Sequence, residues 1–103
     1  MRIYVRVLTD TVKANESIKS GKMGEMLVDF MQTVKPEYAF FTADDGVRCF
    51  NFLVDMKDVA EVPMICERFF VGLGGRISLT PAMVMDDVGR GLAGAADEIK
   101  KWS

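Results

Sequence analysis

The sequence predicts one α+β domain of 103 residues, built on an antiparallel sheet with helices on one side. Segments with two-residue hydrophobic alternation are separated by segments whose apolar residues recur three and four apart. The pair Asp45-Gly46 stands between two strand-like segments, the first of them rich in aromatic residues, and this is typical of a tight hairpin. The length leaves no room for a second domain, so residues 1–103 are treated as a single unit.

The N-terminal third of the chain predicts a strand followed by a helix. Residues 2–9 alternate apolar and polar positions, as a half-buried strand does. Residues 15–35 change to helical spacing, interrupted at Ser20-Gly21. Because serine is a good N-cap, the helix is expected to start properly near Ser20, with a looser turn before it. Pro36 is expected to stop it.

Residues 37–55 predict the hairpin at the centre of the sheet. Residues 38–43 are rich in aromatic strand formers, and residues 47–55 provide the return strand. A type I′ turn needs positive φ at both central residues, which Asp45-Gly46 tolerates. A two-residue turn places Asp44 opposite Val47 and thereby fixes the register.

Residues 58–71 predict a second helix with one apolar stripe. Asp58 and Glu61 have the spacing of a capping box. Pro63 either occupies the first position of a restarted helix or kinks the helix. The glycine-rich residues 72–75 end it and turn the chain.

Residues 76–84 predict the fourth strand, and Asp86 is expected to cap a last helix. The order βαββαβ plus a C-terminal helix is the ferredoxin-like arrangement, with a four-stranded antiparallel sheet. Residues 89–94 have the letters of a dinucleotide-binding fingerprint, but too few residues follow for a βαβ unit. A small-residue helix face that packs closely on another element is expected there.

The predicted sheet has two faces of different character. One face is apolar and suits packing against helices: Ile3, Val5, Val7, Phe41, Phe50, Phe52, Val54, Ile77 and Leu79. The other face mixes aromatic and polar side chains: Tyr4, Arg6, Leu8, Tyr38, Phe40, Thr42, Cys49, Asn51, Leu53, Arg76, Ser78 and Thr80. Such a surface favours a wet cavity or an oligomer interface. A solvated face with a few aromatic residues is the plain alternative.

Composition limits the partners. With glycine included, the apolar share exceeds the roughly 45–50% of soluble domains, which indicates burial against another chain or a core rich in Met and Gly. The net charge of −2 without a basic patch argues against nucleic acid. No apolar run is long enough for a membrane span, and no signal peptide is evident. Two cysteines fit a reducing cytoplasm, where both are thiols, although the sequence alone does not decide whether they form one disulfide.

Four segments carry a resemblance to a known family. They are YAFFTADDG at 38–46, FLVD at 52–55, VPMICERFFVGL at 62–73 and LTP at 79–81. Together they resemble the dimeric α/β-barrel superfamily, in one of its small, functionally uncharacterised branches. The resemblance implies two subunits that press their sheets together around a ligand space. The superfamily includes cofactor-free monooxygenases, muconolactone-type isomerases, haem-binding enzymes and non-catalytic members, so the resemblance selects no activity.

The residue types present restrict the chemistry. The chain has no histidine, which removes His-ligated haem, His–Asp acid–base pairs, Ser-His-Asp triads and His-based metal sites. Cys49 and Cys66 lack the paired spacing of a zinc site, and no metal or cofactor is expected. Cys66 is expected to be a buried, inert thiol. Cys49 would be activated by Arg6 or Arg76 only if it faced a cavity.

These observations predict a cytoplasmic homodimer, associated through the open sheet face, that binds a small aromatic or acidic ligand. The candidate ligand-binding residues share that face: Tyr4, Arg6, Tyr38, Phe40, Asn51 and Arg76. The arginines would hold a carboxylate or enolate while the aromatic rings stack on the ligand. Hydrogen bonding between subunits is the other use of these residues. The alternative functions are a cofactor-independent monooxygenase or isomerase, and a regulatory or accessory subunit.

Overall fold

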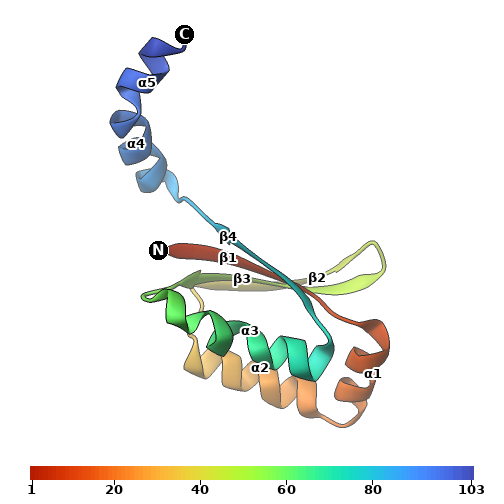
Figure 1. Cartoon of the computed structure of the whole chain (residues 1–103). Coiled ribbons are helices and arrows are strands. Elements are labelled where there is room, and N and C mark those ends of the chain that lie inside the picture. Colours follow the sequence, from red (N-terminus) through yellow and green to blue (C-terminus); the bar gives the residue numbers. More distant parts are fainter.

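The computed structural model describes residues 1–103 and shows a four-stranded antiparallel sheet with helices along one face (Figure 1). The chain is therefore of the α+β class. The strands are β1 (Arg2–Leu8), β2 (Tyr38–Asp44), β3 (Val47–Asp55) and β4 (Arg76–Pro81). Their order in the sheet is β2-β3-β1-β4, which is compatible with a ferredoxin-like fold. No helix is long and apolar enough to cross a membrane.

The helices flank the strands in chain order. Those before β4 are α1 (Thr11–Lys19), α2 (Lys22–Thr33), the short 3-10 helix η1 (Val59–Glu61) and α3 (Val62–Leu73). Two more follow β4: α4 (Met85–Gly94) and α5 (Ala96–Lys101). The prediction that residues before Ser20 form only a loose turn was wrong. The Asp10 side chain accepts a hydrogen bond from the Lys13 amide at 3.0 Å, and this cap starts a regular helix at Thr11.

The hairpin between β2 and β3 has the predicted geometry. Asp44 pairs with Val47, and the two turn residues Asp45 and Gly46 have φ of 52° and 78°. Positive φ at both central residues is the mark of a type I′ turn. The hairpin register therefore sorts the residues of β2 and β3 onto the two faces as the sequence predicts.

The start of α3 also follows local chemistry that the sequence predicts. Asp58 accepts a hydrogen bond from the Ala60 amide at 2.9 Å, and Glu61 accepts one from the Asp58 amide at 2.7 Å, which completes the capping box. Pro63 lies in the first turn of α3, where its missing N–H costs no helical bond, so the helix restarts there. Gly74, with φ of 57°, ends the helix in the left-handed region.

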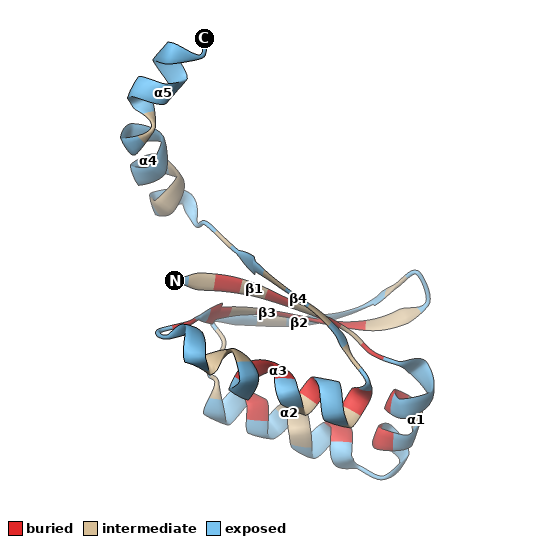
Figure 2. Cartoon of the chain, viewed as in Figure 1, coloured by how far each residue is buried: buried red, intermediate tan, exposed pale blue.

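The core lies between the sheet and helices α1 to α3 (Figure 2). Its centre is a cluster of phenylalanine rings, in which Phe30 lies 4.4 Å from Phe52 and 5.1 Å from Phe69 between centroids. The predicted apolar face of the sheet supplies this core, with one exception. Phe41 is half exposed because it belongs to the edge strand β2 and packs on Phe50 and Phe52 from one side only.

The end of the chain differs from the prediction. The strand β4 ends at Pro81, short of residue 84, and α4 is capped by Asp87 rather than Asp86, through a 3.1 Å bond from the Val84 amide. Helices α4 and α5 project away from the sheet (Figures 1 and 2). We call residues 85–103 the C-terminal arm.

No residue of α4 or α5 is buried. A side-chain atom added at Gly89, Gly91 or Gly94 would have no neighbour within 4 Å. The expected close packing of this small-residue face is therefore absent within one chain.

Candidate ligand-binding face

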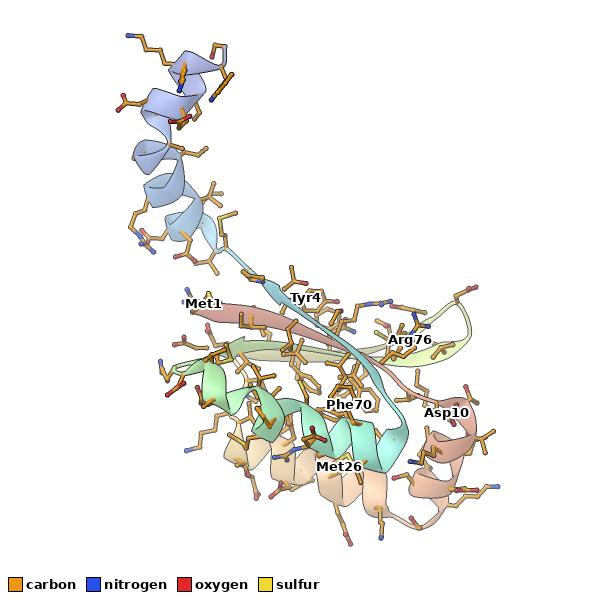
Figure 3. The ribbon with its side chains drawn as sticks, in the orientation of Figure 1. Met1, Tyr4, Asp10, Met26, Phe70 and Arg76 are labelled. Carbon is orange, nitrogen blue, oxygen red and sulfur yellow. The ribbon has the colours of Figure 1, made fainter.

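The candidate residues lie on the side of the sheet that α2 and α3 leave uncovered. Tyr4 and Arg6 come from β1, and Asn51 comes from the neighbouring strand β3. Tyr38 and Phe40 come from β2, and Arg76 comes from β4. Figure 3 shows Tyr4 and Arg76 on the opposite side of the sheet from Met26. The topology thus brings together residues that are up to 72 positions apart in sequence, between Tyr4 and Arg76.

An apolar depression of about 440 Å³ crosses this face at the end where β1 begins; we call it the aromatic hollow. Its lining is apolar throughout: Tyr4, Tyr38, Phe40, Phe52, Leu53 and Ala82. Tyr38 is 70% exposed and Phe40 is 55% exposed, although both are large aromatic side chains. Exposed apolar surface of this kind is a candidate binding site, and a solvated face with a few aromatic residues is its alternative.

A second depression of about 240 Å³ lies at the other end of β1 and β4; we call it the basic hollow. It is lined by Arg6, Leu8, Arg76, Ile77 and Ser78. Tyr4 and Arg6 are two residues apart on one strand face, so the hollows lie about 7 Å apart along β1. In the single chain the two hollows are separate and open, and they do not merge into one closed cavity.

Asn51 has a structural role beneath the open face of the sheet. It is 2% exposed, and the Tyr4 hydroxyl donates a hydrogen bond to its Oδ1 atom. Its own Nδ2 donates to the Phe40 carbonyl at 3.4 Å. Asn51 lines neither hollow, so in this chain it holds Tyr4 and β2 in position instead of offering its amide to a ligand.

The two arginines differ in their partners. Arg6 Nη2 donates to Asp44 Oδ2 at 3.0 Å, and this contact raises the pKa of the guanidinium. The Thr42 hydroxyl and Arg6 lower the pKa of the Asp44 carboxyl. Arg76 forms no salt bridge within the chain. Arg76 is thus the cation of this face that is free to meet an anion.

The cysteines are free thiols on opposite sides of the sheet, so the disulfide left open by the sequence is not formed. Cys49 is fully buried beneath the candidate face, with Sγ 3.8 Å from Asn51 Oδ1. It does not line either hollow, so the condition for its activation by an arginine is not met. Cys66 is buried on α3, and burial raises the pKa of its thiol.

Six lining residues were not among the ligand-binding candidates. The alternation had placed Leu8, Leu53 and Ser78 on the open face, and Phe52 and Ile77 on the helix-packed face, while Ala82 follows the end of β4. No three His, Cys, Asp or Glu side chains are placed to hold a metal ion. Comparison with known protein families, curated proteins and solved structures gives no match to the chain.

Proposed function

We propose that the chain is a homodimeric binding protein for a small compound that carries both an aromatic body and an acidic group. The observation that carries the proposal is the adjacency of an aromatic hollow and a basic hollow on one uncovered sheet face. Tyr4 and Arg6 are about 7 Å apart along β1. A ligand whose ring stacks on Tyr4 therefore reaches Arg6 when its acidic group lies about 7 Å from that ring.

The aromatic hollow suits the apolar part of such a ligand. Its volume of about 440 Å³ lies within the range of roughly 300–1,000 Å³ that is typical of small-molecule sites. Tyr4, Tyr38 and Phe40 present ring surfaces on which a flat ligand can stack. Tyr4 is held in one orientation by Asn51, which lowers the entropy lost on binding.

The basic hollow suits the acidic part. The guanidinium of Arg76 has no internal partner, so its N–H groups remain available for two parallel bonds to a carboxylate. Arg6 lines the same hollow but is paired with Asp44 at 3.0 Å, so Arg76 supplies the unpaired positive charge. A neutral compound of the same shape would gain nothing from that charge.

The homodimer belongs to the same proposal. The open face exposes Tyr38 and Phe40, and an apolar surface of this kind is stabilised when a second protein covers it. Association through this face would also close the hollows from water. Pairing through the sheet is the organisation that the resemblance to the dimeric α/β-barrel superfamily implies, and the strand order β2-β3-β1-β4 is compatible with a ferredoxin-like protomer.

Fluorescence titration tests the ligand class. The probe is anilinonaphthalene sulfonate, an aromatic anion, and its uncharged counterpart phenylnaphthylamine is the comparison. We expect the wild type to prefer the anion. Arg76→Ala should weaken anion binding by roughly tenfold or more and leave the neutral probe unchanged, because a charge-assisted hydrogen bond is lost.

Arg48→Ala is the matched control, since Arg48 lies on the other face of the sheet. Equal loss in Arg48→Ala and Arg76→Ala, or equal affinity of the wild type for both probes, would contradict the proposed site. Native mass spectrometry of freshly purified protein then searches for a retained compound. Chemical conversion of that compound, instead of simple retention, would favour the alternative of a cofactor-independent monooxygenase or isomerase.

A further inference from the structure

The C-terminal arm carries an apolar stripe that nothing in its own chain covers. The stripe follows α4 and α5 at spacings of three and four: Val88, Leu92, Ala95, Ile99 and Trp102. Leu92 is 57% exposed and Trp102 is 77% exposed. A helix with one apolar face normally buries that face, so the stripe lacks its partner.

Contacts at the base of the arm favour the direction in which it projects. The Ala82 amide donates to the Arg2 carbonyl at 3.0 Å, which extends the pairing of β4 with β1 past Pro81. Asp87 caps α4 and also lies 3.5 Å from Arg2 Nη1. Only three residues, 82–84, connect β4 to α4. Folding the arm back onto its own sheet through this short linker would break the contact between Arg2 and Asp87.

We infer that two copies of the chain exchange their arms, so that the apolar stripe of each arm covers the aromatic hollow of the other copy. The inference rests on the proposed homodimer and names the segment that closes its ligand site. Each chain contains one arm and one uncovered hollow. In a dimer with a two-fold axis, the contact between the arm of one copy and the hollow of the other is therefore made twice. The ligand site is incomplete without the partner's arm.

The dimensions of the arm and the sheet agree. Helices α4 and α5 have 10 and 6 residues, and with Ala95 they span about 25 Å at 1.5 Å per residue. β1 has 7 residues and spans about 23 Å at 3.3 Å per residue.

The exposed aromatic side chains supply roughly half of the area that a stable interface buries. At roughly 150–250 Å² per aromatic side chain, the exposed fractions of Trp102, Tyr38 and Phe40 leave about 300–500 Å² open on each chain. A stable interface buries about 800 Å² per partner. Met85, Leu92 and Ile99 on the arm supply further exposed apolar surface.

Cross-linking of two full-length variants tests the exchange. One population carries Tyr38→Cys; the other carries Ile99→Cys and is grown on heavy nitrogen. The two are mixed, allowed to exchange subunits and oxidised gently, and mass spectrometry assigns each disulfide. We expect heavy–light cross-links between positions 38 and 99. Val12→Cys replaces Ile99→Cys in the control, because Val12 is 67% exposed on α1, outside the arm.

The outcomes separate the two proposals. A dimer by light scattering that gives no heavy–light link, or no more than the Val12→Cys control, overturns the arm exchange and leaves the homodimer standing. A monomer at micromolar concentration overturns both. A chain with both Tyr38→Cys and Ile99→Cys that cross-links only to itself shows that the arm folds back, which also overturns the exchange.

A charge placed on the stripe gives a second readout. Leu92→Asp should weaken dimerisation by about 30-fold or more, which is the loss expected at an interface hot spot. Because Leu92 is exposed in the protomer, the circular dichroism spectrum of the protomer should not change. Val12→Asp should leave the dimer intact. Equal dimerisation by Leu92→Asp and the wild type would overturn the inference.

Discussion

The hydroxyl of Tyr4 on β1 donates a hydrogen bond to Oδ1 of Asn51 on the adjacent strand β3, on the face that the helices leave open. Asn51 is almost completely buried there, although its face contacts solvent. This contact fixes one wall of the aromatic hollow. It also gives the buried Asn51 Oδ1 a strong donor, beside the weak donor Cys49 Sγ at 3.8 Å.

Removing the Tyr4 hydroxyl should destabilise the protein. Tyr4→Phe leaves Asn51 Oδ1 with the weak donor Cys49 Sγ, so we expect the free energy of unfolding to fall by about 1–3 kcal/mol. Urea denaturation measures the change. Tyr38→Phe is the control, since Tyr38 is exposed and donates no side-chain hydrogen bond, and its effect should stay within about 0.5 kcal/mol. Equal effects of the two variants would contradict the structural role of Tyr4.

A side chain at Gly74 should strain the end of α3. Gly74 has φ of 57°, and an added Cβ would lie 3.1 Å from Asp10 Cβ and 3.2 Å from Lys13 Cδ. Gly74→Ala is therefore expected to cost about 1–2 kcal/mol of stability. Gly24→Ala in α2 is the matched control, because no atom lies within 4 Å and φ is not positive. That variant should be neutral or stabilising, and the midpoints of thermal unfolding compare the two.

Acid should weaken the contacts at the N-terminus. Lys57 at 2.6 Å and the N-terminal ammonium at 3.2 Å lower the pKa of Asp55. Since the folded pKa lies below the unfolded value of about 3.9, the contribution of Asp55 is present above pH 4 and is lost as pH falls through the folded pKa. Asp55→Asn should therefore flatten the fall in stability below pH 4. The group is exposed, so the effect should be small, and an unchanged acid limb would contradict it.

Both thiols should be protected in the folded protein. Cys49 and Cys66 are buried, and burial raises the pKa of Cys66. Ellman's reagent should titrate neither thiol rapidly at pH 8, and should titrate two after denaturation in guanidinium. Rapid reaction of one thiol in the folded protein would show that Cys49 reaches solvent on the open face, and would revive a reactive role for it.

The sequence predicts the sheet well because its signals are local. Asp45-Gly46 sets the hairpin turn, and the two-residue alternation from that turn assigns every residue of β2 and β3 to a face. The capping box at Asp58 and the stop at Gly74 are likewise set by neighbours within a few positions. Six candidate residues were placed on one face by this reasoning, and the structure has all six there.

The rest depends on contacts that alternation does not describe. Asn51 lies on the open face but is buried, because Tyr4 and Phe40 on the flanking strands cover it. Helix α1 has few apolar residues and owes its start to Asp10. Leu92 and Trp102 have helical spacing in the sequence, but periodicity gives no indication that they find no partner in their own chain.

The solution mass of the full-length protein tests the central claim most directly. Native mass spectrometry at low micromolar concentration should show a species at twice the 11.5 kDa of one chain, and this species should bind anilinonaphthalene sulfonate in preference to phenylnaphthylamine. A species at 11.5 kDa that binds neither probe, or binds both equally, would contradict a ligand site completed on the open face by a second copy.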